Sequence, residues 1–171
     1  MRTIQKGPEP VTLTRHRQQP HADYDNYRDM DGLRAALVAE QRGVCCYCQS
    51  RIRATAEGMK VEHWQCQVHH PDRQLDYRNL LGACHGGHGR PKHEQHCDTR
   101  KSNNALCFSV PRLVSNRKAV LAAFQQRLKD GRRVDPAREL LKWDGTQGGE
   151  LPEFAQVMVY WLCKRLRRAS V

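Results

Sequence analysis

The apolar positions ahead of the first cysteines have the spacing of an amphipathic helix. Leu33, Leu37 and Val38 fall on one face of a helix over residues 29–42, because side chains three or four positions apart lie above one another on a helix surface. Gly43 follows directly and is typical of a helix end. The pattern predicts a helix that packs its apolar face in the core and leads the chain into a cysteine-rich segment.

Two different patterns follow further along the chain. Polar and apolar residues alternate over 59–64, which predicts a short strand. Neighbouring side chains of a strand point to opposite faces, so Glu62 and His63 are expected on opposite faces unless the strand ends or twists there. Asp76 is a good N-cap, and it predicts a short helix over residues 77–84.

Proline-rich, polar sequence precedes this central segment, and helical patterns follow it. Pro8, Pro10 and Pro20 interrupt the first residues, so an extended basic arm is expected there. Further helices are expected over residues 97–106, 116–130, 136–143 and 152–168. The predicted domains are the arm over 1–28, an α+β core over 29–108 and a helical region over 109–171.

Composition narrows the partners and the compartment. The chain has 171 residues and a formal net charge of +11, which favours a polyanionic partner, with nucleic acid first and an acidic membrane surface second. The alternative is a soluble protein with a solvated basic face. The first twenty residues lack the apolar stretch of a signal peptide, and no run approaches the ~20 apolar residues of a membrane span. A cytoplasmic protein with no membrane partner is therefore expected.

The cysteines of such a protein are expected to bind metal rather than form disulfides. Cys45 and Cys48 have the Cys-x-x-Cys spacing of a zinc knuckle, and Cys84 and Cys97 can complete a closed, tetrahedral structural Zn²⁺ site. A long loop separates the second pair, so competing ligands stay open. These competitors are Cys46, His85, His88, His93 and His96. The cysteines left out, as small buried apolar residues, are Cys66, Cys107 and Cys163.

Residues between these cysteines suit metal-dependent hydrolysis of a phosphodiester, which needs a base, a water and a cation at the developing charge. His63 can be the base because its ordinary pKa lies near neutrality. Glu62 and Asp98 can hold one divalent cation, Mg²⁺ or Mn²⁺, through oxygen. Asn79 can fix the His63 loop through backbone bonds, or ligate the cation itself. The side chains that can hold phosphate are Lys101 and Arg100.

Each of these residues also has a simpler interpretation. Asn79 can merely start a helix, and Asp98 can cap the helix that follows Cys97. Lys101 can be a solvated surface cation, and a Glu-His dipeptide carries no information by itself. The nuclease hypothesis therefore depends on the order in which these residues occur along the chain.

That order resembles the HNH endonucleases. The matching segments are Cys45-Cys46-Tyr47-Cys48, Val61-Glu62-His63, Asn79-Leu80-Leu81-x-x-Cys84 and His96-Cys97-Asp98-x-x-Lys101. More narrowly, residues 30–105 resemble the HNH subunit of Septu and retron-associated anti-phage defence systems (PtuB-like). The resemblance implies a small zinc-stapled ββα-metal core of the HNH, or His-Me finger, class, flanked by N-terminal and C-terminal helices.

The resemblance also implies roles for single residues and partners. His63 would be the general base, Glu62 a metal ligand and Asn79 the middle residue of the motif. Asp98 stands where many HNH enzymes have His or Asn, so the third metal ligand stays open between Asp98, His93 and His96. Family members work beside an ABC/SMC-like ATPase (PtuA-like), and in some systems with a retron reverse transcriptase and its RNA–DNA product.

The sequence thus leads to the expectation of a metal-dependent endonuclease, the effector of a defence complex. DNA is favoured as the target over RNA, and RNA stays open. The main alternative is a zinc-stapled nucleic-acid-binding or assembly subunit without catalysis. That alternative needs the cysteines and the basic charge but neither Glu62 nor His63.

Overall fold

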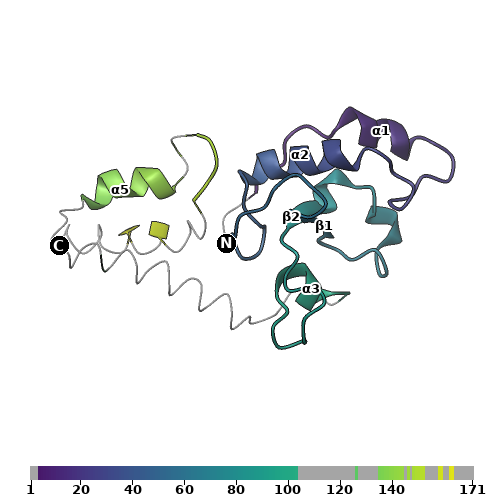
Figure 1. The fold of residues 1–171 in the computed structure, drawn as a ribbon. Coiled ribbons are helices and arrows are strands. Elements are labelled where there is room, and N and C mark those ends of the chain that lie inside the picture. Colours follow the sequence, from purple (N-terminus) through teal and green to yellow (C-terminus); the bar gives the residue numbers. More distant parts are fainter. Residues whose placement is uncertain are drawn as a thin grey trace. The chain divides into compact units, whose positions relative to one another are not determined.

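The computed structural model describes residues 4–103, 126, 135–144, 146, 148–152, 158–159 and 162–163. The chain divides into two compact units, one of Ile4–Ser109 and one of Val110–Val171 together with Met1–Thr3. In the first unit the elements are α1 (Val11–Arg17), α2 (Met30–Gln41), β1 (Lys60–His63), β2 (Leu80–Ala83) and α3 (Cys97–Lys101) (Figure 1). The described part of this unit is therefore a small α+β structure.

Helix α2 forms as its apolar spacing predicts. Asp29 is the N-cap, and its side chain accepts a hydrogen bond from the Gly32 amide at 3.0 Å. Arg42 ends the helix in the left-handed conformation, with a φ of 55°. Leu33 and Leu37 are completely buried, and α2 packs against β2. The predicted helix over 29–42 is confirmed, and its apolar face covers the sheet.

Truncating this face should destabilise the unit. We expect Leu37→Ala to lower the free energy of unfolding by about 2–5 kcal/mol, because the removed methyl groups leave a cavity beside β2. Val11→Ala in α1 is the control, since Val11 is 63% exposed. Urea denaturation followed by circular dichroism measures both values, and an equal, small effect of the two substitutions would contradict this description of the core.

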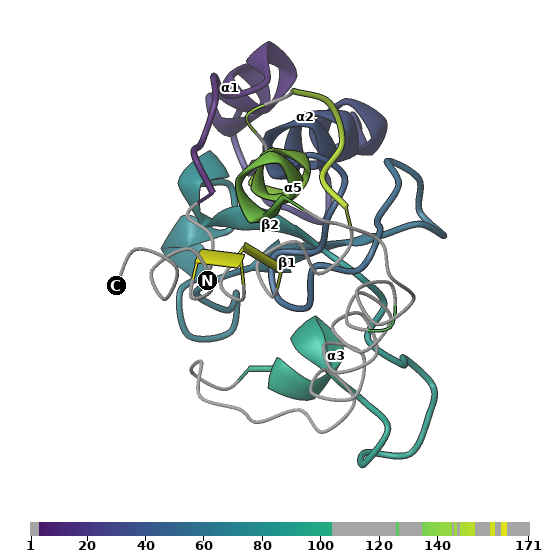
Figure 2. The ribbon, with the colours of Figure 1, turned by 90° about the vertical axis from the view of Figure 1, so that its left-hand side faces the viewer.

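The two strands form an antiparallel pair in which Glu62 lies opposite Leu81 and His63 lies opposite Leu80. Figure 2 shows them as the central sheet of this unit. His63 is the last residue of β1. The strand expected over 59–64 is confirmed, and its end coincides with the candidate general base.

The helix expected over residues 77–84 is wrong. Asp76 does act as an N-cap, with its side chain accepting from the Arg78 amide at 2.9 Å, but it caps only a single 3-10 turn, Tyr77–Asn79. The following residues form β2 because the Gly82 amide donates to the side chain of Gln41 at 2.6 Å and the strand pairs with β1. Pairing with a sequence-distant strand, which a local pattern does not encode, overrides the helical signal.

The first residues do not form an extended arm, so that expectation is also wrong. Helix α1 begins directly after Pro10 and anchors itself through Leu13, which is completely buried. Arg17 at its end donates to the Leu75 carbonyl at 3.0 Å and pairs with Glu9 at 3.0 Å. Proline at a helix start costs no hydrogen bond, which is why Pro10 permits a helix here.

In the second unit, the described residues include α5 (Pro136–Trp143), and Asp135 caps it by accepting from the Ala137 amide at 2.9 Å. The helix predicted over 136–143 is therefore confirmed. The predicted helix over 116–130, and most of the one over 152–168, lie outside the described residues. Helix α3 ends at Lys101, and residues 104–106 of the predicted 97–106 helix are also outside. Among the residues that the structure describes, no helix has the length and apolar character needed to cross a bilayer.

Candidate active site and metal centre

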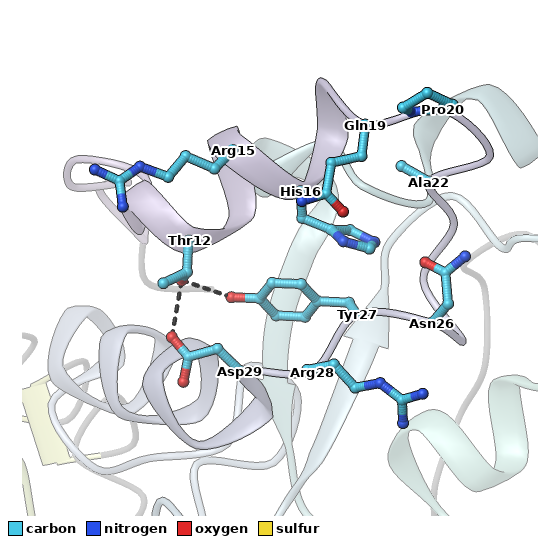
Figure 3. Close-up of a pocket in the computed structure, with 10 residues that line it drawn as sticks. All are labelled: Thr12, Arg15, His16, Gln19, Pro20, Ala22, Asn26, Tyr27, Arg28 and Asp29. Atoms are coloured by element: carbon cyan, nitrogen blue, oxygen red, sulfur yellow. Dashed lines mark hydrogen bonds between the residues drawn. The ribbon is translucent and has the colours of Figure 1, made fainter.

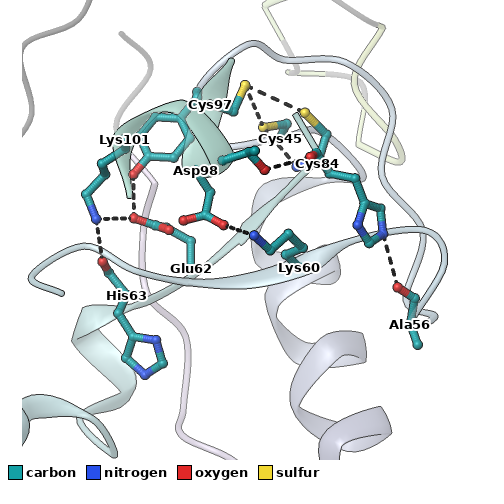
Figure 4. Close-up of polar contacts among 12 residues, drawn as sticks. Cys45, Ala56, Lys60, Glu62, His63, Cys84, Cys97, Asp98 and Lys101 are labelled. Atoms are coloured by element: carbon teal, nitrogen blue, oxygen red, sulfur yellow. Dashed lines mark hydrogen bonds and ion pairs between the residues drawn. The ribbon is translucent and has the colours of Figure 1, made fainter. Parts of the chain in front are cut away.

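The four cysteines predicted as zinc ligands come together from three parts of the chain. Their sulfur atoms lie within 4.8 Å of one another. The Sγ–Sγ distances are 4.0 Å for Cys45–Cys97, 3.6 Å for Cys48–Cys84 and 3.6 Å for Cys84–Cys97. Figure 4 shows the sulfur atoms of Cys45, Cys84 and Cys97 together. Sulfurs bound to one tetrahedral zinc at about 2.3 Å lie about 3.8 Å apart. The cluster therefore has dimensions that could hold a structural zinc ion.

Backbone amides contact two of the sulfur atoms. The Cys84 amide donates to the Cys45 sulfur at 3.3 Å, and the Ser50 amide donates to the Cys48 sulfur at 3.4 Å. Hydrogen bonds from the thiols of Cys45, Cys48 and Cys97 lower the pKa of Cys84 despite its burial, whereas contacts with the neighbouring thiols raise the pKa values of those three cysteines. Metal binding requires deprotonated cysteine, so a bound ion would displace the protons of these three thiols.

Most of the competing ligands are not in this cluster. Cys46 donates its amide to the Gly82 carbonyl at 3.0 Å, and its side chain is not among the grouped ligands. His85 bonds the Ala56 carbonyl, and His93 pairs with its neighbour Glu94. The Nδ1 of His96 lies 3.1 Å from the Cys97 sulfur and 4.0 Å from that of Cys84, so His96 borders the cluster.

The two predicted acids meet on the side of β1 that faces α3. The Glu62 Oε1 accepts hydrogen bonds from the Tyr47 hydroxyl at 2.7 Å and from the Lys101 ammonium at 2.6 Å. Asp98 pairs with Lys60 at 2.5 Å. The side chains of Glu62 and Lys101 are each only 2% exposed. Figure 4 shows this set of acids and lysines between β1 and α3.

The two carboxyl groups have opposite pKa shifts. Burial contributes most to the raised pKa of Glu62, a hydrogen bond with Asp98 adds to the rise and Lys101 opposes it, so that this pKa lies at about 8. Burial also acts to raise the pKa of Asp98, but hydrogen bonds from Glu62 and Lys60 outweigh it and lower that pKa. Two adjacent carboxyl groups are suitable oxygen ligands for a hard divalent cation, which would favour the ionised form of Glu62.

Lys101 is held inside this site instead of lying on the surface. Its ammonium also donates to the His63 carbonyl at 2.8 Å, so it connects α3 to β1. A side chain with this burial is not accessible to a phosphate, which differs from the expected phosphate contact. Arg100 is exposed and donates to the Lys92 carbonyl at 2.8 Å.

The role of Lys101 can be tested by a double-mutant cycle. We expect Lys101→Met to lower the free energy of unfolding by about 3–5 kcal/mol, because it leaves the Glu62 carboxyl buried without its cation. Adding Glu62→Gln should recover part of that loss, since the neutral amide needs no counter-charge. Thermal unfolding of the four proteins gives the coupling. Additive effects of the two substitutions would show that this pair does not hold α3 on β1.

The imidazole of His63 points away from these acids (Figure 4). Its Nε2 lies 3.0 Å from the Gln74 carbonyl, and the Tyr24 ring meets it edge-on, with centroids 4.6 Å apart. A carbonyl only accepts, so Nε2 carries the hydrogen and Nδ1 carries the lone pair. Burial lowers the pKa of His63. The ring is therefore a neutral base in a fixed orientation.

Asn79 holds the loop between β1 and β2. Its Oδ1 accepts from the Gln65 amide at 2.8 Å, and its Nδ2 donates to the carbonyls of Gln65 at 3.0 Å and Arg73 at 3.1 Å. Asn79 is 4% exposed. Asn79 thus has the first of the two roles expected for it: it acts as a staple that fixes the loop through hydrogen bonds to the backbone. It closes the loop that carries Gln74, the partner of His63.

Removing this staple should loosen the loop. We expect Asn79→Ala to destabilise the unit by about 1–3 kcal/mol for each backbone group left buried without a partner. Amide hydrogen exchange should then rise selectively over residues 64–79. Exchange that rises equally across α2 would mean that Asn79 supports the whole unit and not this loop.

Four residues of the site were not identified from the sequence. Tyr47 and Lys60 bind the acids, and Tyr24 and Gln74 orient His63. The alternation of β1 could have indicated Lys60, because it shares a face with Glu62. Tyr47 lies between two cysteines of the cluster, Cys45 and Cys48, where an aromatic residue gives no signal of a role at the acids. Tyr24 and Gln74 come from loops, for which the local sequence gives no signal.

Comparisons with known proteins do not assign a family to this chain. No protein-family model matches the chain, and no curated protein matches it significantly. The cysteine cluster, the acid pair and the fixed histidine therefore carry the functional argument.

Proposed function

We propose that the chain is a metal-dependent endonuclease of the HNH type, in which His63 takes the proton from the attacking water. The observation that supports it most is the fixed imidazole. Its Nε2 hydrogen is donated to the Gln74 carbonyl, and Asn79 holds the loop that presents this carbonyl. A base needs a lone pair and a fixed direction, and Nδ1 of His63 combines them, in a ring whose lowered pKa keeps it neutral.

The order of elements supports the same proposal. β1 and β2 pair, and α3 follows, with Cys97, Asp98 and Lys101 on it. This corresponds to the ββα-metal arrangement expected of an HNH core. Zinc at the four cysteines would fix α3 relative to the sheet and take no part in the chemistry.

Glu62 and Asp98 are the residues that would hold the divalent cation. When bound, the cation would stabilise negative charge on the phosphoryl and leaving oxygens. Lys101 and Tyr47 hold the Glu62 carboxyl group in place. His63 ends β1, and Glu62 precedes it with its side chain on the opposite face of the strand.

Nucleic acid is the substrate class that fits the charge. With a net charge of +11, the chain attracts a polyanion without reading its sequence. DNA is the target we propose first. A partner ATPase of the ABC/SMC-like type would control when the nuclease acts, as the resemblance to the HNH subunits of anti-phage defence systems implies.

The test is cleavage of end-labelled DNA and RNA by the purified chain with Mg²⁺ or Mn²⁺, with reactions that lack the added cation, at equal zinc content, as the control. We expect cation-dependent cleavage, faster on DNA. Glu62→Gln should abolish the cation-dependent cleavage, whereas a surface substitution such as Arg90→Ala should leave it unchanged. Salt-dependent binding without cleavage, both alone and with a co-purified ATPase, would favour the non-catalytic zinc-stapled binding subunit.

A further inference from the structure

A cavity of about 510 Å³ lies between α1 and the segment that leads into α2. Its volume falls within the range of about 300–1,000 Å³ that is typical of small-molecule sites. The residues that matter for what it binds are Arg15, His16, Gln19, Ala22, Tyr27 and Arg28 (Figure 3). None of them belongs to the acid pair or the cysteine cluster.

Two aromatic rings form its inner wall, and both are fixed. The Tyr27 hydroxyl lies 2.9 Å from Thr12 Oγ1, which itself donates to Asp29 at 2.8 Å. The Nε2 of His16 bonds the Asp23 carbonyl at 2.9 Å, and the His16 and Tyr27 rings are 5.2 Å apart and tilted by 56°. Rigid rings at a cavity wall are suitable surfaces for a planar ligand.

Two guanidinium groups lie at the outer edge of the cavity. Arg15 and Arg28 are exposed, and within the part of the chain that the structure describes their side chains form no ion pair or hydrogen bond. Three other arginines do have acidic partners. These pairs are Arg17–Glu9, Arg34–Asp31 and Arg90–Glu94. Unpaired guanidinium groups beside an aromatic wall combine the two features that a nucleotide needs, one for phosphate and one for the base.

The same segment connects the cavity to His63. Tyr24 lies between Ala22 and Tyr27, and its ring contacts the His63 imidazole. Gln19, whose side-chain amide makes no hydrogen bond within the described residues, is placed to bond a base edge. A strand whose phosphate reaches His63 could therefore place a neighbouring nucleotide in this cavity.

We propose that the cavity binds one unstacked nucleotide of the nucleic-acid strand. Its base lies against His16 and Tyr27, and its phosphate lies at Arg28. This proposal rests on the proposed function for the identity of the strand. It adds a binding subsite that the nuclease motif does not contain.

The experiment measures binding alone, on the cleavage-deficient His63→Ala protein. Fluorescence anisotropy follows a short fluorescein-labelled single-stranded DNA, with adenosine 5′-monophosphate as competitor. Ala22→Phe fills the cavity without changing charge, and we expect it to weaken binding about tenfold with an unchanged salt slope. Arg28→Ala should weaken binding by a similar factor and lower the salt slope by about one.

Matched variants keep the result interpretable. Arg90→Ala removes the same charge in another loop and controls for Arg28→Ala. Gln19→Ala, at an exposed position, should weaken binding about threefold. This variant replaces Ala22→Phe in the test if Ala22→Phe proves to be unfolded in a thermal melt. Binding by Gln19→Ala and Ala22→Phe that equals the parent, or no binding by the parent, overturns the proposal. Weakened binding by these variants, together with a wild-type chain that does not cleave DNA or RNA either alone or with a co-purified ATPase, overturns the nuclease function and leaves the subsite standing.

Discussion

Replacing His63 by alanine lowers the cleavage rate by about 10²- to 10⁴-fold and leaves the fold intact. The imidazole is the group whose lone pair takes the proton from water, and its orientation is fixed by Gln74 and Tyr24. The remaining rate comes from phosphate positioning and from the cation. Single-turnover cleavage of labelled DNA measures the change, and thermal unfolding checks the fold.

Two further variants separate catalysis from structure. His63→Gln keeps an N–H group that can donate to the Gln74 carbonyl but has no base, so it should lose cleavage like the alanine variant and unfold like the parent. His69→Ala removes an imidazole from the same loop at an exposed position and should cleave like the parent. Parent-like cleavage by His63→Gln would assign the histidine a structural role only.

Loss of zinc unfolds the first unit. Its sheet has two strands of four residues each, and α3 has only five residues, so these elements have little stability of their own. Zinc binding in small zinc domains contributes about 10–16 kcal/mol, which is comparable to the ~5–15 kcal/mol stability of a whole domain. We expect a strong chelator, or Cys97→Ser, to abolish the cooperative thermal transition of this unit.

Substitutions at cysteines outside the cluster provide the control. Cys66→Ser and Cys46→Ser should retain one zinc per chain and a cooperative transition. Zinc content by elemental analysis and circular dichroism on the same samples connects metal to fold. A chelated protein that melts at the parent temperature would show that the cysteines are ordinary buried thiols.

The cysteine cluster and the acid pair are built on the same short elements. Tyr47 lies between Cys45 and Cys48, and its hydroxyl holds Glu62. Asp98 directly follows Cys97 on α3. Any loss of the metal therefore displaces the groups that hold the carboxylates, so zinc release should stop cleavage before the unit is fully unfolded.

The local sequence was sufficient to predict those elements whose ends and buried faces are determined by residues close to them in the chain. Helix α2 follows from its apolar spacing and its Asp29 cap, and α5 follows from Asp135. The cysteine set follows from ligand spacing. The opposite faces of Glu62 and His63 follow from strand geometry alone.

The remaining features depend on contacts between distant residues. β2 forms because Gly82 meets Gln41 and β1, which outweighs the helical signal after Asp76. Lys101 is buried because its ammonium donates hydrogen bonds to the Glu62 carboxyl group and the His63 carbonyl, which lie on another element. The orientation of His63 comes from Tyr24 and Gln74, which are remote along the chain.

Chemical rescue tests the central claim most directly. Cleavage by His63→Gly is measured with and without added imidazole, at equal zinc content. If His63 is the base, the variant should be nearly inactive, and imidazole should restore part of the rate in proportion to its neutral form. Cleavage by His63→Gly at the parent rate without imidazole would contradict the assignment of His63 as the base.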